Sequence, residues 1–364
     1  INTYHIQFRR KMIKYCLKKI VVVYFLSFVL MACQTSSQLI WSKKIPAPQP
    51  SSALAFIDHY LFYIDNGKGI NRVNLNNQEL VQKELLLSPY TPLSVSQNLI
   101  YCTDKSGKLL VLNKNLEIVK SIALGLQIQS PISFEKQVCY FLAKSQSNNG
   151  KIYAYDIKQE KIVWESEHYV SMPLGNTIKI FPDELVFTGA NSLYRVDKKT
   201  GKSIAFYDLF SSQNSYQGNL PQPTYNDHND VYVGSTGSNI YGFSLNNKRL
   251  IWISALNKLD QKVYAKDQEL VYDWDEKKGQ IIAREFKTGN IRWTYDTSGK
   301  RVTAIGKNNN TLFIGVDKQL ITLNNKGAEI NKTPLQDEVI PNFGIHNRQL
   351  FFASQDFYLH CYQF

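Results

Sequence analysis

One strand motif recurs through almost the whole chain of 364 residues, and this internal repeat limits the possible fold more than any other feature. The copies read LFYID, LIYCTD, VCYFLA, LVFTGA, VYVGST, LVYDWD, LFIGVD and LFFASQD, and they begin 38 to 47 residues apart at Leu61, Leu99, Val138, Leu185, Val231, Leu270, Leu312 and Leu350. A short strand-like segment precedes each copy, and further turns and strand-like segments follow it. Four strands in a period of about 40 residues are the sequence signature of a β-propeller.

Composition agrees with an all-β fold. Aromatic residues make up 13% of the chain, and tyrosine, phenylalanine and β-branched residues favour strands. Both faces of the repeated strands tend to be apolar, as expected where each sheet lies between two neighbours. The sequence therefore predicts one domain over residues 38–364, an eight-bladed β-propeller with four-stranded antiparallel blades.

The two ends of the repeat region predict how the ring closes. Trp164, Trp252 and Trp293 lie 21 to 26 residues beyond the start of their copies, on the expected last strand of each blade. The last copy has only 14 residues after Leu350. We expect the segment QLIWSKKIP, residues 38–46, to supply the missing strand and so to remove the free sheet edge.

The N-terminal segment has the features of an export signal. Lys14, Lys18 and Lys19 precede an uncharged run of 13 residues, 20–32, which is shorter than the roughly 20 residues of a membrane-spanning helix. This pattern predicts a signal peptide in residues 1–32, with Met12 as a candidate start.

The signal segment ends in LMAC, which resembles the lipobox of bacterial lipoproteins. The resemblance implies cleavage and lipidation at Cys33, with residues 33–37 as a short tether. Export implies an oxidising compartment. Cys102 and Cys139 nevertheless fall inside predicted strands, where unpaired cysteines behave as small hydrophobic residues, so no disulfide framework is expected.

Charge gives no indication of nucleic-acid binding. The formal net charge is +12, but six basic residues and no acidic ones lie in the first 33 positions. The remaining excess of +6 is spread thinly, without a run of Lys and Arg interleaved with aromatic residues. We expect no nucleic-acid partner.

Three segments resemble the repeat of propellers of the pyrroloquinoline-quinone type, whose pattern is roughly A-x-D-x-x-T-G-x-x-x-W. They are AYDIKQEKIVW, VDKKTGKSIA and EFKTGNIRW. Quinoprotein dehydrogenases of this type carry an adjacent pair of cysteines over the cofactor, and this sequence has no such pair. We therefore expect no cofactor, and we expect the tryptophans to lock neighbouring blades together as large apolar side chains.

An eight-bladed propeller of this repeat type, on a lipid anchor and in a chain of this length, resembles the BamB family. These lipoproteins belong to the machinery that assembles β-barrel proteins in outer membranes. The resemblance implies a scaffold without enzymatic activity that acts as a monomer within a complex and binds the POTRA domains of the barrel-forming subunit. Gln34 follows the cysteine where an aspartate would favour the inner membrane, so we expect an outer-membrane location facing the periplasm.

The same resemblance supplies candidate partner-binding residues. The family has a loop resembling Leu-Arg-Gly, followed by Ala-Pro, before its fifth blade. Here YQGNLPQP places Tyr216 and Gln217 where the family has leucine and arginine, and Gly218 matches. Tyr225 lies in the same long loop, where an exposed tyrosine would anchor an interface. Asp260 corresponds to an acidic segment one blade later.

These residues leave other interpretations open. The long loop could be a tolerated surface insertion, and a scaffold of this kind could bind a different envelope protein. A ligand-binding or enzymatic propeller of the quinoprotein type, which uses its central channel, is the less favoured alternative.

No motif predicts catalysis or a metal site. DWDEKKG, residues 273–279, clusters acids as a calcium site does, but other copies have a hairpin turn there. TGKS, residues 200–203, is not a phosphate loop because Val196 occupies the position that requires glycine. The six histidines have no metal-ligand spacing.

Overall fold

The computed structural model shows a chain built from β-strands. It describes residues 38–48, 54–66, 69–87, 93–144, 150–167, 178–188, 192–208, 224–226, 231–236, 239–244, 246–247, 249–255, 264–266, 269–308 and 310–364. In this part of the chain every regular element is a strand, and no helix has the length and hydropathy needed to cross a membrane.

The described strands pair into eight antiparallel sheets, named here by their strands. Four of the sheets contain β2 (Ala55–Ile57), β3 (Tyr60–Ile64), β4 (Gly69–Asn74) and β5 (Leu80–Glu84); β6 (Ser94–Ser96), β7 (Leu99–Thr103), β8 (Lys108–Leu112) and β9 (Ile118–Ala123); β10 (Gln127–Ile128), β11 (Ser133–Glu135), β12 (Val138–Lys144), β13 (Gly150–Asp156) and β14 (Lys161–Glu165); and β15 (Lys179–Ile180), β16 (Glu184–Thr188), β17 (Ser192–Asp197) and β18 (Ser203–Asp208). The other four contain β19 (Thr224–Asn226), β20 (Val231–Thr236), β21 (Asn239–Ser244) and β22 (Arg249–Ala255); β23 (Tyr264–Lys266), β24 (Leu270–Asp275), β25 (Gln280–Glu285) and β26 (Ile291–Asp296); β27 (Val302–Asn308), β28 (Thr311–Val316), β29 (Gln319–Asn324) and β30 (Glu329–Pro334); and β31 (Val339–His346), β32 (Gln349–Ser354), β33 (Tyr358–Gln363) and β1 (Gln38–Lys44).

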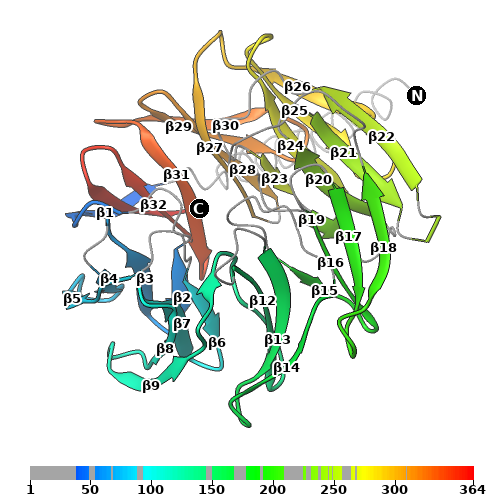
Figure 1. Cartoon of the computed structure of the whole chain (residues 1–364). Coiled ribbons are helices and arrows are strands. Elements are labelled where there is room, and N and C mark those ends of the chain that lie inside the picture. Colours follow the sequence, from blue (N-terminus) through cyan, green and yellow to red (C-terminus); the bar gives the residue numbers. More distant parts are fainter. Residues whose placement is uncertain are drawn as a thin grey trace, which may run out of the picture.

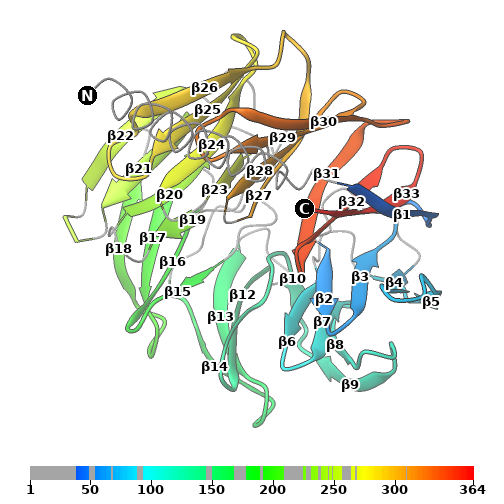
Figure 2. The same cartoon turned by 180° about the vertical axis from the view of Figure 1, so that it is seen from behind.

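The sheets follow one another around a common centre, as Figures 1 and 2 show from opposite sides. In six of the described sheets, consecutive strands are hydrogen-bonded neighbours, so the sheet is a meander that runs outward from the centre. In the β10–β14 sheet, β10 and β11 both pair with β12, and in the last sheet the outermost strand is β1. Each repeated sequence motif forms the second strand of its sheet, because the motif is apolar on both faces and must be covered on both sides. The predictions of an all-β chain and of antiparallel four-stranded sheets are confirmed.

The first described strand belongs to the last sheet. Strand β1 pairs antiparallel with β33, with Gln38 opposite Gln363 and Lys44 opposite Tyr358. It ends two residues earlier than the predicted segment 38–46. After Lys44, the backbone N–H of Ile45 donates to the carbonyl oxygen of Phe357 (2.9 Å), and Pro46 has no N–H with which to continue the ladder.

The hydrophobic core is divided into clusters, most of which lie between neighbouring sheets. One cluster joins the β2–β5 sheet to the sheet that contains β1: Leu61 and Tyr63 pack with Phe351 and Cys361, and Trp41 of β1 packs against them. The ring of Trp41 lies 6.1 Å from that of Phe351, measured between centroids. The first and last sheets are therefore held together by the same kind of contact as the other neighbours.

The three described cysteines are buried and unpaired. Burial raises the pKa of the thiols of Cys102, Cys139 and Cys361 to about 12. Because the thiolate is the reactive form, these groups are poor nucleophiles and poor disulfide partners. The sequence-based prediction for Cys102 and Cys139 is confirmed.

Three tryptophans, Trp164, Trp252 and Trp293, join their sheets to the next through a hydrogen bond as well as through packing. The indole Nε1–H of Trp164 donates to the carbonyl oxygen of Lys198 in the β17–β18 turn (3.0 Å). Trp252 makes the same bond to Phe286 (2.9 Å), and Trp293 makes it to Asn325 (2.9 Å). The prediction of locking by apolar bulk was thus incomplete, since each indole also needs a backbone acceptor in the neighbouring sheet.

The acceptor turn explains the remaining residues of the repeat. Asp197 accepts hydrogen bonds from the backbone N–H of Thr200 (2.8 Å) and from its hydroxyl (2.7 Å), which holds the pKa of this carboxyl below its usual value. Gly201 follows with a φ of 73°, and the Trp164 ring covers it. The TGKS segment is therefore a hairpin turn that receives a tryptophan.

The tight contact at this turn gives a prediction with a matched control. A Cβ atom on Gly201 would lie 2.4 Å from Cε3 of Trp164, whereas one on Gly299, with a similar φ of 71°, would meet nothing within 4 Å. Gly299→Ala should lower the free energy of unfolding only by the cost of the backbone conformation, about 1 kcal/mol. Gly201→Ala should cost a further 1–3 kcal/mol or so, because the ring must move. Denaturant titration of both variants measures the difference, and equal losses would contradict the assigned packing.

Candidate functional site

The described strand ends that lead from one sheet to the next lie on one face of the molecule. Strands alternate in direction, so the connection from the last strand of one sheet to the first strand of the next leaves from the same face as the turn between second and third strands. Isolated bridges tie these two kinds of segment together at Pro48 and Asp65, and at Leu87 and Asp104. We call this the connection face.

The predicted partner-binding residues belong to two of these connections. Tyr216, Gln217 and Gly218 lie between β18 and β19, and Asp260 lies between β22 and β23, outside the described residues. The prediction that Tyr225 lies in the long loop is wrong for its backbone: Tyr225 is on the short strand β19, paired with Tyr232, because the chain there already forms the first strand of the next sheet. Its side chain is outside the described part. Cys33 also lies outside. The described ends of β18 and β22 and the starts of β19 and β23 lie on the connection face.

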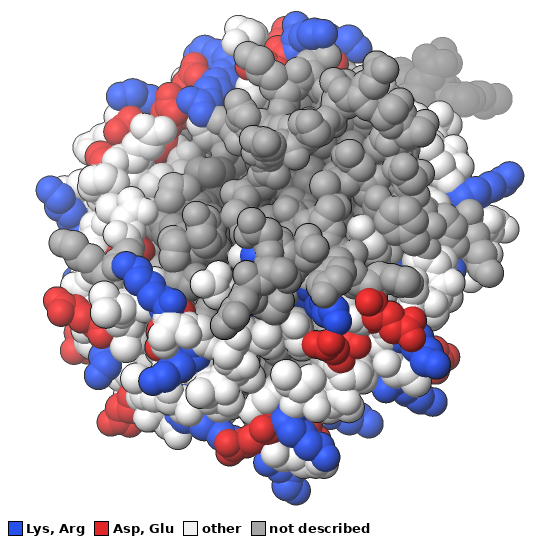
Figure 3. All heavy atoms as spheres, in the orientation of Figure 1, with Lys and Arg blue, Asp and Glu red and all other residues white. Residues whose placement is uncertain are grey.

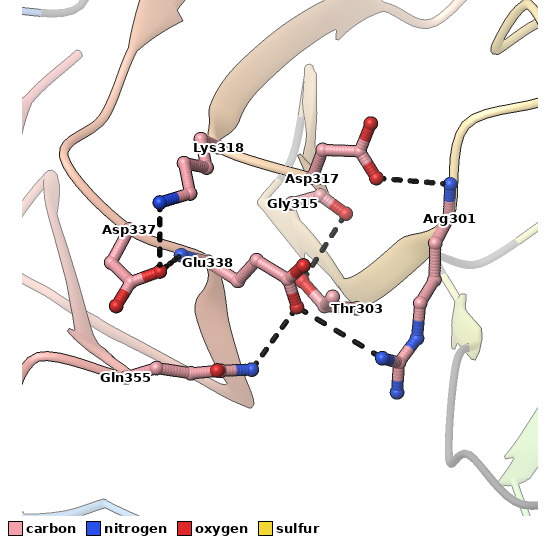
Figure 4. A network of polar contacts seen from close by, with 8 residues as sticks. All are labelled: Arg301, Thr303, Gly315, Asp317, Lys318, Asp337, Glu338 and Gln355. Atoms are coloured by element: carbon pink, nitrogen blue, oxygen red, sulfur yellow. Dashed lines mark hydrogen bonds and ion pairs between the residues drawn. The ribbon is translucent and has the colours of Figure 1, made fainter.

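In the described residues, the same face carries a polar network that spans neighbouring sheets (Figure 4). The carboxylate of Glu338 accepts a hydrogen bond from Gln355 (3.0 Å) and lies 4.0 Å from the guanidinium of Arg301. The Lys318 ammonium lies 3.5 Å from the carboxylate of Asp337, which immediately precedes Glu338 in the chain. The network thus connects the β26–β27 and β30–β31 connections to the turns of two sheets.

Backbone hydrogen bonds hold this network in place more firmly than its charges do. The N–H of Leu335 donates to the carbonyl oxygen of Lys318 (2.8 Å), and that of Gln355 donates to the carbonyl oxygen of Glu338 (2.9 Å). The Arg301 and Lys318 side chains are more than half exposed, and exposed ion pairs contribute only about 0–1 kcal/mol each. The result is an ordered polar surface, which suits docking of a protein partner.

Charges of both signs are mixed on the face drawn in Figure 3. Lys, Arg, Asp and Glu side chains alternate around its periphery wherever residues are described. This pattern differs from the single basic stripe that is typical of nucleic-acid binding.

Ser354, Asp356 and His360 form a constellation that the sequence analysis did not predict. The Ser354 hydroxyl donates to Asp356, and its oxygen lies 2.8 Å from Nε2 of His360. With the serine proton on the carboxylate side, the histidine must donate to the serine oxygen. A nucleophilic serine needs the opposite arrangement, in which histidine takes the serine proton and the acid holds the histidine.

The surroundings of this group also favour a structural role. Ser354 is 1% exposed, and burial lowers the pKa of His360 below its usual value. The Tyr358 carbonyl oxygen is an alternative acceptor 3.2 Å from the same hydroxyl, so with either acceptor the serine closes the β32–β33 turn. Sequence reasoning missed it because the contact depends on the register that sets Phe352 opposite His360.

Two acids of the segment DWDEKKG are paired with basic side chains. Asp273, on β24, receives a hydrogen bond from Nε of Arg284 on β25 (2.8 Å), and both side chains are at least nine-tenths buried. Asp275 lies 3.5 Å from Lys278 in the following turn. Among the described residues, no group of three or more His, Cys, Asp and Glu side chains is arranged to hold a metal ion.

Burial and the arginine act on Asp273 in opposite directions. Burial raises the pKa of the carboxyl to about 6, although the Arg284 charge lowers it; the Asp275 charge raises it further. Its Oδ1 atom has no hydrogen-bond partner among the described residues. A second pair, Arg195 and Glu184, is bidentate at 2.7 and 2.9 Å but less buried.

Successive antiparallel four-stranded sheets around a centre define the protein as a β-propeller. Its fold is similar to that of BamB from Moraxella catarrhalis, at a TM-score of 0.69 and 16% identity, over 90% of this chain and 100% of that one. It is also similar to a quinohemoprotein alcohol dehydrogenase from Pseudomonas putida, at a TM-score of 0.62 and 10% identity, over 90% and 76% of the two chains. A third similar structure is Sqt1 of Saccharomyces cerevisiae, at a TM-score of 0.66 and 11% identity, over 90% of this chain and 99% of that one.

These likenesses establish the fold, which is a β-propeller. No protein-family model and no curated protein matches the sequence. The similar structures have different functions, so the choice among them must rest on the features of this chain.

Proposed function

We propose that this protein is a non-enzymatic, lipid-anchored scaffold of the cell envelope that supports insertion of β-barrel proteins into the outer membrane. In this proposal it faces the periplasm, acts as a monomer within a complex and binds the barrel-assembly subunit through its POTRA domains. The observation that carries the proposal is the likeness to BamB from Moraxella catarrhalis over the whole length of that chain.

The proposal includes an eight-bladed ring that the N-terminal strand closes. The eight sheets of the described residues support the blade number. The paired register of β1 and β33, together with the Trp41 cluster, supports the closure. A closed ring would give the scaffold a rigid body without a free edge between its first and last sheets.

We assign docking to the connection face. The two connections with candidate residues emerge there, next to the ordered network of Arg301, Lys318 and Glu338. Tyrosines bury much area at low entropic cost, and the network offers carboxylates and cationic groups for hydrogen bonds at the rim of an interface.

Co-purification tests the partner. The lipidated protein, extracted in gentle detergent, should bring down the barrel-assembly subunit. Tyr216→Ala combined with Gln217→Ala should reduce the recovered subunit at least several-fold, whereas Lys199→Ala, in a turn on the opposite face, should leave it unchanged. Recovery of a different envelope protein would favour the alternative in which the scaffold has another partner.

The lipid anchor gives a separate prediction. Cys33→Ser should remove the protein from the outer-membrane fraction, because no acyl chains are attached. The chain should then appear in the soluble fraction or keep its signal peptide uncleaved. Gln34→Asp should keep the lipid and shift the protein toward the inner membrane. Density-gradient fractionation measures both, and an unchanged distribution of Cys33→Ser would exclude lipidation at this position.

The likeness to the quinohemoprotein alcohol dehydrogenase motivates a second candidate, a quinone-binding propeller. A rise in melting temperature with pyrroloquinoline quinone and calcium would favour it. The pairing of Asp273 with Arg284 and of Asp275 with Lys278 leaves this acidic segment poorly suited to calcium.

A further inference from the structure

The outer edge of the last sheet exposes apolar side chains near both ends of β1. Leu39 and Ile40 of β1 are 45% and 46% exposed, and Phe357 of the adjacent β32–β33 turn is 43% exposed. Lys44 is exposed at the end of β1 next to Phe357, since Ile45 bonds to the Phe357 carbonyl. We call these four residues the β1 edge; the strand places its ends roughly 17 Å apart.

This edge is held firmly by the sheet behind it. The β1 backbone is paired with β33 along its length, and Trp41 points the other way, into the cluster with Phe351 and Cys361. The exposed positions therefore belong to a fixed surface of the propeller.

The charge of the sheet is suited to an anionic surface. Strands β31, β32, β33 and β1 contain no Asp or Glu, while β1 carries Lys43 and Lys44. The turn that carries Phe357 contains one acid, Asp356, which accepts a hydrogen bond from the Ser354 hydroxyl. Lysines near an anionic leaflet are attracted to it, and acids are repelled.

Other outermost strands also expose aliphatic residues: β14 exposes Ile162 and Val163 and ends in Glu165, whereas β9 and β22 contain no acid. Charge alone therefore does not distinguish β1 from β9 and β22; its place in the chain next to Cys33 does.

The position of the edge in the chain identifies what covers it. Only residues 34–37 separate Cys33 from Gln38, the first residue of β1. Fully extended, this tether reaches roughly 15 Å. We propose that the β1 edge lies against the membrane, with Leu39, Ile40 and Phe357 among the lipid headgroups and Lys44 facing anionic phosphates. This proposal rests on the proposed lipid anchor at Cys33.

The depth of this contact is limited by the strand itself. As the outermost strand of its sheet, β1 presents backbone N–H and C=O groups on the side away from β33. Such groups cannot be satisfied in hydrocarbon, so only side chains enter the acyl region and the backbone remains at headgroup level.

Fluorescence quenching in vesicles tests the orientation. The lipidated chain is reconstituted in vesicles of phosphatidylethanolamine and phosphatidylglycerol that contain a headgroup nitroxide. A fluorophore on Ser42→Cys of β1 should be quenched at least three-fold more than one on Ser203→Cys of β18, on the far side of the molecule in both views. Both serines are exposed and on outermost strands, and the described native cysteines are buried. Equal quenching at the two positions would overturn the proposal. It would also be overturned if the protein without vesicles forms a dimer in which Ser42 is covered by a second copy of the chain.

A second arm separates this proposal from the lipid anchor. The chain from residue 33 with Cys33→Ser retains every described residue and should co-sediment weakly with the same vesicles. Leu39→Ser with Ile40→Ser should reduce this binding at least five-fold, whereas Ile162→Ser with Val163→Ser should not. If vesicle binding does not depend on Leu39 and Ile40, the proposal fails even where lipidation is demonstrated. If the native chain is not lipidated, the co-sedimentation of these variants still shows whether the β1 edge binds the membrane.

Discussion

Replacing Arg284 by methionine should lower the free energy of unfolding at neutral pH by about 3–5 kcal/mol, because it leaves the Asp273 carboxylate buried without its cation. Asp273 is 2% exposed and Arg284 is 9% exposed, so neither solvent nor salt can replace the lost partner. Urea titration of the variant measures the loss directly.

The matched control removes both charges. In the double variant Asp273→Val with Arg284→Met, no ion is buried, and most of the lost stability should return, since apolar replacements of buried pairs are often neutral or stabilising. If the double variant is as unstable as the single one, the loss arises from packing around Arg284, and the electrostatic explanation is wrong.

The same pair predicts a pH dependence. Burial raises the pKa of Asp273 to about 6 in the folded protein, so the folded state holds this proton more tightly than the unfolded state. Its contribution to stability is fully present below about pH 4 and is lost as the pH rises through about 6, by up to about 3 kcal/mol. The cost of Arg284→Met should therefore be largest at neutral pH and smaller near pH 4–5. A loss that is independent of pH would contradict this assignment.

Trp252→Ala should also destabilise the protein by about 3–5 kcal/mol, because it removes a large buried side chain between two sheets. The indole packs against Gly289 of the next sheet and donates to the carbonyl oxygen of Phe286. Without it, the β19–β22 and β23–β26 sheets lose their outer contact and a buried carbonyl loses its donor.

Two further variants separate these effects. Trp252→Phe keeps most of the apolar area and should cost less, about 1–2 kcal/mol, mainly through the lost hydrogen bond. Ile253→Ala, at the next position of the same strand but 45% exposed, should change stability by less than about 1 kcal/mol. Equal losses for Trp252→Ala and Ile253→Ala in denaturant titrations would exclude a special role for the indole.

Much of the fold could be predicted from the sequence because local patterns repeat. The position of the second strand in every sheet follows from the repeated apolar motif at Leu61, Leu99 and their equivalents. The turns follow from residues such as Asp197 and Gly201, whose side chain and backbone conformation define a hairpin without help from distant residues.

Side-chain contacts between paired strands and between neighbouring sheets could not be derived in the same way. The partner of Arg284 is Asp273, and it depends on the β24–β25 register; the acceptor of Trp164 is the Lys198 carbonyl, which lies in another sheet. The Ser354, Asp356 and His360 group and the Arg301 to Glu338 network likewise require the positions of several turns at once.

The sequence by itself determined the class of architecture, the strand that repeats and the residues that form each turn, since apolar periodicity and turn chemistry are properties of neighbouring residues. The predicted lipid site at Cys33 and the candidate residues in the two connections remain predictions from sequence. Only the tertiary structure decided which side of β1 is buried by Trp41 and which side exposes Leu39 and Ile40. The reason is physical: burial and pairing depend on which surfaces meet when sheets that are far apart in the chain pack together.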